Sequence, residues 1–430
     1  MSRRPLAILE FGWHGSLRRC LSIVAPVLWF ALATASAGDW PTYMHDNARS
    51  GVTTESLRLP LTEHWVCRAP AVPQPAWPDP QPNAEMPKMK FDDAFYTVAV
   101  GGTVFFGSSV DHQVYALDAG TGRVRWRFFT GGPVRLAPTV ADGRVYAGSD
   151  DGKVYCLAAE DGRLLWSFDA APEPRRVIGN GQIISLWPVR TGVLMEGDRL
   201  FFGAGIFPYH APALHALDAK TGRSIPWKDH LDKDWSGLSP QGYLLRAGRG
   251  LVVPCGRTMP LVVDCDTGKQ RFSVLKLVGY DRQKTGGAAG DYGVVVGDVL
   301  HIGTQNALSG IDVPTGLLRS RLLPVHRLVA SPESYFVFNA PPLPSALPKA
   351  KGLEYAGITA LDRARQDQTE INDPAGIAAS TRWRSPRAGV VALILAGDHL
   401  IAGCKGEVAI LSARDGKNCG RQKSRVMRSD

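Results

Sequence analysis

The chain has 430 residues, 44% of them hydrophobic, and a formal net charge of +9 from 49 basic and 40 acidic side chains. A chain of this length buries a substantial core, and a charge this small for its size excludes the strongly basic footprint of a nucleic-acid-binding protein. Its seven cysteines lie at spacings that form no compact framework, which excludes a small disulfide-stapled scaffold.

Residues 1–37 have the features of a secretory signal peptide. Four arginines between positions 3 and 19 precede the apolar run 20–33, and Ala35-Ser36-Ala37 offers small residues for cleavage. Cleavage would remove four Arg and one Glu and lower the net charge to +6 (9 − 4 + 1). We expect export to the periplasm or the extracellular space, with no integral membrane span afterwards. The alternative is an uncleaved anchor, because the apolar run is near the lower limit for crossing a bilayer.

Two unusual segments come next in the chain. Residues 61–66 read Leu-Thr-Glu-His-Trp-Val, a strand-like phrase that contains Trp65 although no repeat precedes it. The Pro-rich stretch 69–90 is predicted to form an extended strap that leads into the first repeat.

Between residues 118 and 413 one phrase recurs seven times. It consists of an alternating apolar run, an Asp or a similar residue, a small residue and a Gly turn, as in 114–126 and 154–166. Successive copies lie 40 to 60 residues apart, and each resolves into four short strands joined by turns such as Asp142-Gly143. Repeats of this length with an all-β pattern predict the blades of a β-propeller. The tryptophans that end several copies are expected to pack between blades: Trp126, Trp166 and Trp227.

The last repeat supplies three strands, at 388–395, 399–403 and 407–411, and then runs into the basic tail 418–430. We therefore expect the segment 61–66 to supply the missing outer strand, which would close the ring and hide two sheet edges. The prediction is one all-β domain over residues 38–417, a seven-bladed propeller of four-stranded antiparallel blades. Eight blades is the alternative, if Trp65 belongs to a degenerate extra blade.

Two of the cysteines leave an alternative open. Cys255 and Cys265 flank a predicted hairpin and could face each other across its strands as a disulfide. They could equally be buried free thiols, because Cys156 already occupies a repeat position where Ala116 stands in another copy.

The phrase Val-Tyr-Ala-Leu-Asp-Ala-x-Thr-Gly at 114–122 resembles the pyrroloquinoline-quinone-like (PQQ-like) repeat, and the opening Asp-Trp-Pro-Thr-Tyr at 39–43 looks like the start of exported proteins that carry it. This family contains the quinoprotein alcohol and glucose dehydrogenases. It also contains non-catalytic propellers such as the outer-membrane β-barrel assembly lipoprotein. The repeat itself is a packing motif and does not choose between the two classes.

Enzymes of this family hold the quinone on the propeller axis beside a calcium ion, and commonly carry a disulfide between adjacent cysteines. Here no two cysteines are adjacent, and no Asp-x-Asp-x-Asp-Gly loop occurs. The carboxylates of 229–234 are interrupted by His and Lys, which favours a solvated loop over a calcium site. We therefore expect no cofactor and a chain nearer the non-catalytic propellers. The alternative is a PQQ- and calcium-dependent quinoprotein oxidoreductase.

The predicted insertions are concentrated on one face. In a four-stranded blade, the loop between the second and third strands lies on the same face as the connection to the next blade. The insertions 169–187, 204–213, 228–239, 275–290 and 339–356 all fall on this loop-rich face. Insertions on one face of a repeat protein commonly build its binding surface, and Arg and aromatic side chains most often anchor interfaces. The candidate binding residues are Arg175, Arg176, Trp187, Tyr209, His210, Trp235, Arg257 and Arg282.

The sequence thus predicts an exported binding or scaffold protein. Its ligand would be a protein, a peptide or a cell-envelope component, with no nucleic acid, and the protein is expected to be a monomer.

Overall fold

The computed structural model describes residues 38–69, 71–78, 89, 91–227, 239–255, 258–273, 289–304, 307–322, 325, 327–339, 357–369, 373–404 and 406–423. The chain divides into two units, Met1–Ala37 and Gly38–Asp430. The predicted signal peptide coincides with the first unit and lies outside the described residues, so every described element belongs to the second unit. Within these described ranges, no helix is both long and apolar enough to span a bilayer.

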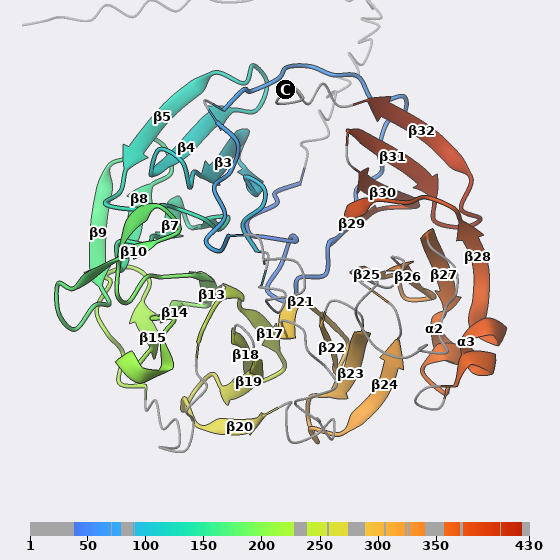
Figure 1. Cartoon of the computed structure of the whole chain (residues 1–430). Coiled ribbons are helices and arrows are strands. Elements are labelled where there is room, and N and C mark those ends of the chain that lie inside the picture. The colour runs from blue at the N-terminus through green and yellow to red at the C-terminus, as the bar shows by residue number, and fades with distance from the viewer. Residues whose placement is uncertain are drawn as a thin grey trace, which may run out of the picture. The chain divides into compact units, whose positions relative to one another are not determined.

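Sheets of short antiparallel strands follow one another in chain order around the second unit (Figure 1). The first sheet consists of β2 (Thr97–Val100), β3 (Thr103–Gly107), β4 (Gln113–Asp118) and β5 (Val124–Phe129). The second consists of β6 (Thr139–Ala141), β7 (Arg144–Gly148), β8 (Lys153–Ala158) and β9 (Leu164–Asp169). The third consists of β13 (Leu194–Glu196), β14 (Arg199–Ala204) and β15 (Ala213–Asp218).

Four further sheets complete the series. The fourth contains β17 (Leu245–Ala247), β18 (Gly250–Cys255), β19 (Thr258–Asp264) and β20 (Gln270–Ser273). The fifth contains β21 (Ala289–Val296), β22 (Val299–Thr304), β23 (Ala307–Asp312) and β24 (Leu318–Leu322). The sixth contains β25 (Arg327–Ala330), β26 (Ser334–Asn339), β27 (Gly357–Asp362) and β28 (Thr381–Ser385). The seventh contains β1 (Val52–Thr53), β29 (Val390–Ala396), β30 (His399–Cys404), β31 (Glu407–Ser412) and β32 (Asn418–Lys423).

A few short elements lie in the connections. They are the hairpin of β10 (Arg176–Gly179) and β11 (Gln182–Ser185), the parallel pair of β12 (Thr191–Gly192) and β16 (Gly242–Tyr243), the 3-10 turn η1 (Pro208–His210), and the helices α2 (Arg363–Gln366) and α3 (Pro374–Ser380). The predicted fold class, an all-β propeller of mostly four-stranded antiparallel blades, is confirmed. Seven sheets of three or more strands are found in the described part of the chain. Whether the ring has seven blades or eight stays a prediction.

Tryptophans link consecutive sheets, as the repeat pattern predicts. The indole N–H of Trp126, in β5, donates to the carbonyl of Ala159 in the next sheet at 2.9 Å. Its ring lies where a side chain on Gly162 would point, since a Cβ there would come within 2.6 Å of the ring. Trp166 makes the same two contacts with Ala219 and Gly222, so the Gly of each turn provides room for the aromatic ring of the preceding repeat.

The predicted closing strand is wrong in two respects. Residues 61–66 form no strand, and the outer strand of the seventh sheet is β32, which pairs antiparallel with β31 inside the segment expected to be a basic tail. An N-terminal strand does join this sheet, but it is β1, which pairs parallel with β29 through Val52 and Leu395. The tail residues form a strand because an exposed outer strand requires no apolar alternation.

Trp65 instead makes the contact with the next sheet that the last tryptophan of a repeat makes elsewhere. β32 carries no tryptophan, and the indole N–H of Trp65 donates to the carbonyl of Ala119 at 2.9 Å while its ring covers Gly122. Trp65 therefore gives the first sheet the aromatic contact that Trp126 gives the second.

Residues 40–53, here called the N-terminal plug, run past the innermost strands of the sheets. Trp40 pairs with Ala99 of β2, and the amide side chain of Asn47 donates to the Met195 carbonyl of β13 at 2.6 Å. Further backbone hydrogen bonds to the plug run from Val140 to Pro41, from Arg246 to Asn47, from Val295 to Ala48, from Leu395 to Gly51 and from Gly397 to Thr53, at 2.7–3.0 Å. Six of the seven sheets thus form hydrogen bonds with one continuous segment, and Val52 packs against the apolar cluster that contains Val329 of the sixth. Each contact lies close to the turn between the first and second strands of its sheet. By topology these turns lie on the face opposite the loop-rich face, so the plug lies toward that opposite face.

Candidate functional site

The hairpin β10–β11 lies in the connection between the second and third sheets, and therefore on the loop-rich face. Asn180 and Gly181 form its turn with φ values of 47° and 80°, and both values suit this Asn-Gly pair. Ile178 and Ile183 lie opposite each other in the register and are 82% and 64% exposed. An exposed pair of this kind leaves a small apolar patch at the tip of the hairpin.

A second loop lies beside this hairpin. Tyr209, in η1, is 97% exposed. Trp187 follows β11 and is buried, and its indole N–H donates to the carbonyl of His210 at 2.6 Å. Trp187 thus ties the hairpin segment to the loop that presents Tyr209.

The structure describes five of the eight predicted binding residues, all in the hairpin segment or in the loop that Trp187 joins to it. Arg175 and Arg176 are exposed at the base of the hairpin, and Arg175 lies 3.3 Å from the carboxylate of Glu173. Tyr209 is exposed and His210 half-buried, whereas Trp187 is buried and serves as a support for the loops rather than a contact surface. The other three predicted residues, Trp235, Arg257 and Arg282, lie outside the described residues.

Sequence reasoning missed the two isoleucines. Their signal was present, since Asn-Gly stands between the short apolar runs 177–178 and 183–184 and therefore predicts a hairpin. Ile178 and Ile183 would then face each other across the turn.

Beneath the hairpin lies a buried network of charges. The carboxylate of Asp150 is fully buried and accepts hydrogen bonds from Arg135 Nε at 2.6 Å and from Arg190 Nε and Nη2, each at 3.0 Å. Arg135 also donates to Asp92 at 2.9 Å, so two guanidinium groups face two carboxylates. Burial alone would raise the pKa of Asp150, but Arg190 and Arg135 outweigh it and hold the pKa below its usual value.

The described parts of the Pro-rich strap lie over this network. The indole N–H of Trp77 donates to the Gln241 side chain at 2.8 Å, and the Arg190 guanidinium lies 5.5 Å from the Trp77 ring. Gln74 donates to the Asn180 carbonyl at 2.8 Å and accepts from Gln182 at 2.6 Å. The strap therefore supports the hairpin as well as covering the charges.

Aromatic rings fill the space between the strap and the plug. Tyr43 of the plug stacks on Tyr243 with ring centroids 3.6 Å apart, and Tyr96 packs edge-on against both. Burial raises the pKa of Tyr96 and Tyr243 well above the usual value, so both remain neutral.

In the enzymes that the repeat resembles, the quinone and the calcium ion occupy the propeller axis, and calcium needs six or more convergent oxygens. Here Tyr243 and Trp77 pack against the same apolar cluster, and the Arg190 guanidinium of the charge network lies over the Trp77 ring. Among the residues that the structure describes, no group of three or more His, Cys, Asp or Glu side chains is arranged to hold a metal.

Among the described residues, the free thiols include those of Cys67, Cys156, Cys265, Cys404 and Cys419. Cys255 and Cys265 are buried in the same apolar cluster, but Cys255 lies opposite Thr258 in the hairpin register. Burial raises the pKa of Cys255 to about 12 and that of Cys265 to about 11, which makes both poor nucleophiles at neutral pH.

Comparisons with known proteins support the repeat family and the propeller fold. Residues 76–225 match the family model described as outer membrane protein assembly factor BamB. The prediction that this chain carries PQQ-like repeats is thereby confirmed. No curated protein matches the chain.

Solved propellers share the fold at low identity. The quinohemoprotein alcohol dehydrogenase ADHIIG from Pseudomonas putida HK5 is 15% identical, with 91% of this chain and 73% of that chain covered and a TM-score of 0.57. A europium-containing methanol dehydrogenase is 13% identical, with 90% and 85% covered and a TM-score of 0.56. The computationally designed protein Ika8 is 13% identical, with 76% and 86% covered and a TM-score of 0.53. Identities this low indicate a shared fold and nothing further about activity.

Proposed function

We propose that this chain is an exported, non-catalytic propeller that binds a protein or peptide partner through the hairpin β10–β11 and the adjoining loop of Tyr209. The observation that carries the proposal is the exposed pair Ile178 and Ile183, with Arg175 and Arg176 at its base. An apolar centre with a basic rim suits a partner that offers apolar side chains next to carboxylates.

The rigidity of the hairpin supports this proposal. Its turn is held from below by Asn180, whose side chain donates to the Pro75 carbonyl at 2.7 Å, and by the contacts of Gln74. Because the supporting strap is fixed in turn by buried groups, little ordering is needed when a partner binds.

The close packing of the aromatic and charged side chains supports a non-catalytic role. A quinoprotein oxidoreductase would need room for a quinone, whereas here Tyr43 stacks on Tyr243 at 3.6 Å and Arg190 lies over the Trp77 ring. Export is proposed from the basic and apolar pattern of residues 1–37.

A photo-crosslinking experiment tests the binding face. A benzophenone amino acid is placed at position 178 and, as the matched control, at position 163 on a short turn of the opposite face. We expect a discrete adduct from position 178 that excess wild-type protein suppresses and the double variant Ile178→Ser/Ile183→Ser does not. Equal labelling from both positions, or suppression by the double variant, would contradict the proposed face.

A separate experiment tests the non-catalytic role. The purified protein is titrated with pyrroloquinoline quinone and calcium while absorbance and dye-linked alcohol oxidation are recorded. We expect neither saturable uptake nor turnover. Stoichiometric uptake with turnover would favour the oxidoreductase alternative instead.

A further inference from the structure

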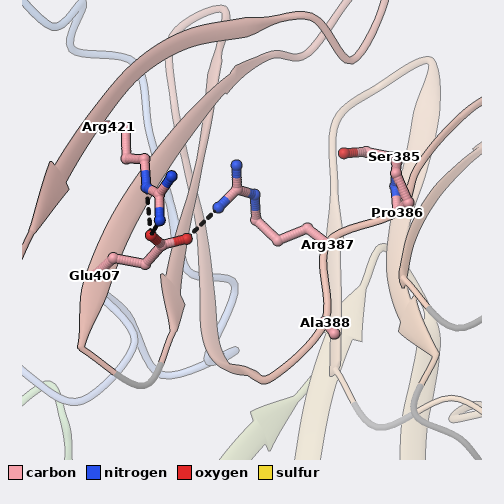
Figure 2. Close-up of a pocket in the computed structure, with 6 residues that line it drawn as sticks. All are labelled: Ser385, Pro386, Arg387, Ala388, Glu407 and Arg421. Carbon is pink, nitrogen blue, oxygen red and sulfur yellow. Dashed lines mark hydrogen bonds and ion pairs between the residues drawn. The ribbon is translucent and has the colours of Figure 1, made fainter.

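A pocket of about 330 Å³ lies at the seventh sheet, far along the chain from the hairpin β10–β11 (Figure 2). Ser385, at the end of β28, and Arg387 belong to the connection that leads into β29, while Glu407 begins β31 after the turn from β30. Both segments belong by topology to the loop-rich face. The lining residues are Ser385, Pro386, Arg387, Ala388, Glu407 and Arg421.

One carboxylate in this pocket is shared by two guanidinium groups. Glu407 Oε1 accepts a hydrogen bond from Arg387, and Oε2 accepts from Arg421, so Glu407 lies between the two arginines in Figure 2. The side chains of Arg387 and Glu407 are 20% and 15% exposed, and that of Arg421 is 56% exposed. All three therefore reach water through the pocket, and the lining carries a net charge of +1.

The buried network around Asp150 differs from this pocket in its balance of charges. There, Arg135 and Arg190 are matched by the two carboxylates of Asp150 and Asp92. In the pocket, the second carboxylate is missing from the lining, and a hollow opens beside the two arginines. Lys423, opposite Glu407 in the register of β31 and β32, adds a further positive charge nearby.

We propose that this pocket binds a small oxyanion, the phosphate or carboxylate group of a small molecule, on the guanidinium groups of Arg387 and Arg421. Each guanidinium has five N–H donors in a planar fork that matches such groups, and Glu407 occupies only part of the two sets. The hydroxyl of Ser385 offers one more donor at the opposite side of the pocket. The volume exceeds that of a bare phosphate ion, so the natural ligand carries additional atoms.

Calorimetric titration of the full chain at constant ionic strength tests this proposal. Inorganic phosphate and succinate are titrated separately, since one carries the phosphate and the other the carboxylate chemistry. We expect weak, saturable binding of at least one probe, with Arg387→Gln weakening it about ten-fold because a hydrogen bond to a charged group is lost. Glu407→Gln is expected to tighten it several-fold, because removing the internal carboxylate raises the pocket charge and frees donors.

Two further variants serve as a control and as a replacement. Arg163→Gln removes an exposed arginine beside Asp161 on the opposite face and is expected to leave binding unchanged. Arg421→Gln, on the exposed strand β32, is expected to weaken binding while the pair of Arg387 and Glu407 remains, so it replaces Glu407→Gln if that variant unfolds. Binding of phosphate alone or succinate alone would support the site and identify the chemistry. No saturable binding of either probe, or binding that Arg387→Gln leaves unchanged, would overturn the proposal.

Discussion

Replacing Arg49 by Met is expected to destabilise the domain more than any change at an exposed arginine. Arg49 is 1% exposed and no carboxylate accepts from it in its described contacts. Its guanidinium donates to the carbonyls of Leu244 at 2.9 Å and Tyr43 at 3.0 Å and to the hydroxyl of Thr42 at 2.8 Å. Through these bonds one side chain joins the plug to the segment that precedes β17.

The magnitude is set by these contacts. Each hydrogen bond to a charged donor is worth about 1.5–3 kcal/mol, and an acceptor left buried without a partner costs about 1–3 kcal/mol. Part of this is offset because the charge itself is buried, as burial lowers the pKa of Arg49 to about 10. We therefore expect Arg49→Met to lower the free energy of unfolding by about 3–5 kcal/mol, because three acceptors lose their charged donor at once.

Urea denaturation followed by tryptophan fluorescence measures this loss. The control is Arg123→Met, at an exposed turn of the first sheet, with an expected change within about 0.5 kcal/mol. If Arg49→Met fails to fold, Thr42→Val removes one of the same hydrogen bonds and should cost about 1 kcal/mol. A loss below about 1 kcal/mol for Arg49→Met would refute the view that the plug is held by this side chain.

Three other changes have defined outcomes. Asp150→Asn should lower the free energy of unfolding in urea by about 3–5 kcal/mol because two guanidinium groups lose their carboxylate, and adding Arg190→Met should recover part of the loss. Trp65→Ala should lower the free energy of unfolding by about 1–3 kcal/mol, since the ring is only half-buried, and with it the thermal midpoint measured by circular dichroism. An unchanged midpoint would contradict its role as a contact between segments. Burial lowers the pKa of His215 and of His301 to about 4, below the unfolded value of about 6.5. For each histidine, the free energy of unfolding is therefore unaffected above pH 6.5 and falls by up to about 3 kcal/mol as the pH drops toward 4. His215→Phe should flatten the curve of stability against pH over this window. An unchanged slope would refute the assignment.

The repeat pattern made most of the fold predictable, because each turn obeys local rules. Asp118 accepts hydrogen bonds from the backbone and hydroxyl of Thr121 at 2.9 and 2.8 Å, and Gly122 takes a positive φ of 69° beside them. Such a turn depends on residues within five positions, so the sequence alone reveals it. The tryptophan contacts were predictable for the same reason, since they recur at a constant offset from the turn.

The features that failed prediction depend on distant partners. The plug has no periodicity of its own, and its hydrogen bonds go to strands between about 60 and 340 residues away, as with Trp40 to Ala99 and Gly51 to Leu395. β32 contains no aliphatic or aromatic side chain and was therefore assigned to a tail. Of the candidate site, the clustering of Arg175, Arg176 and Tyr209 followed from topology, whereas the burial of Trp187 depends on the neighbouring loop of His210.

The plug also has a consequence for the order of assembly. During synthesis residues 40–53 leave the ribosome before any of the strands that they contact, including β29, which is made almost last. The backbone groups of Gly51 and Thr53 therefore stay unpaired until the last repeat is made, although Trp40 and Pro41 can pair with β2 and β6 much earlier. A chain that stalls before β29 would present an unpaired Gly51–Thr53 stretch, a ready signal by which quality-control proteins could distinguish unfinished molecules from complete ones.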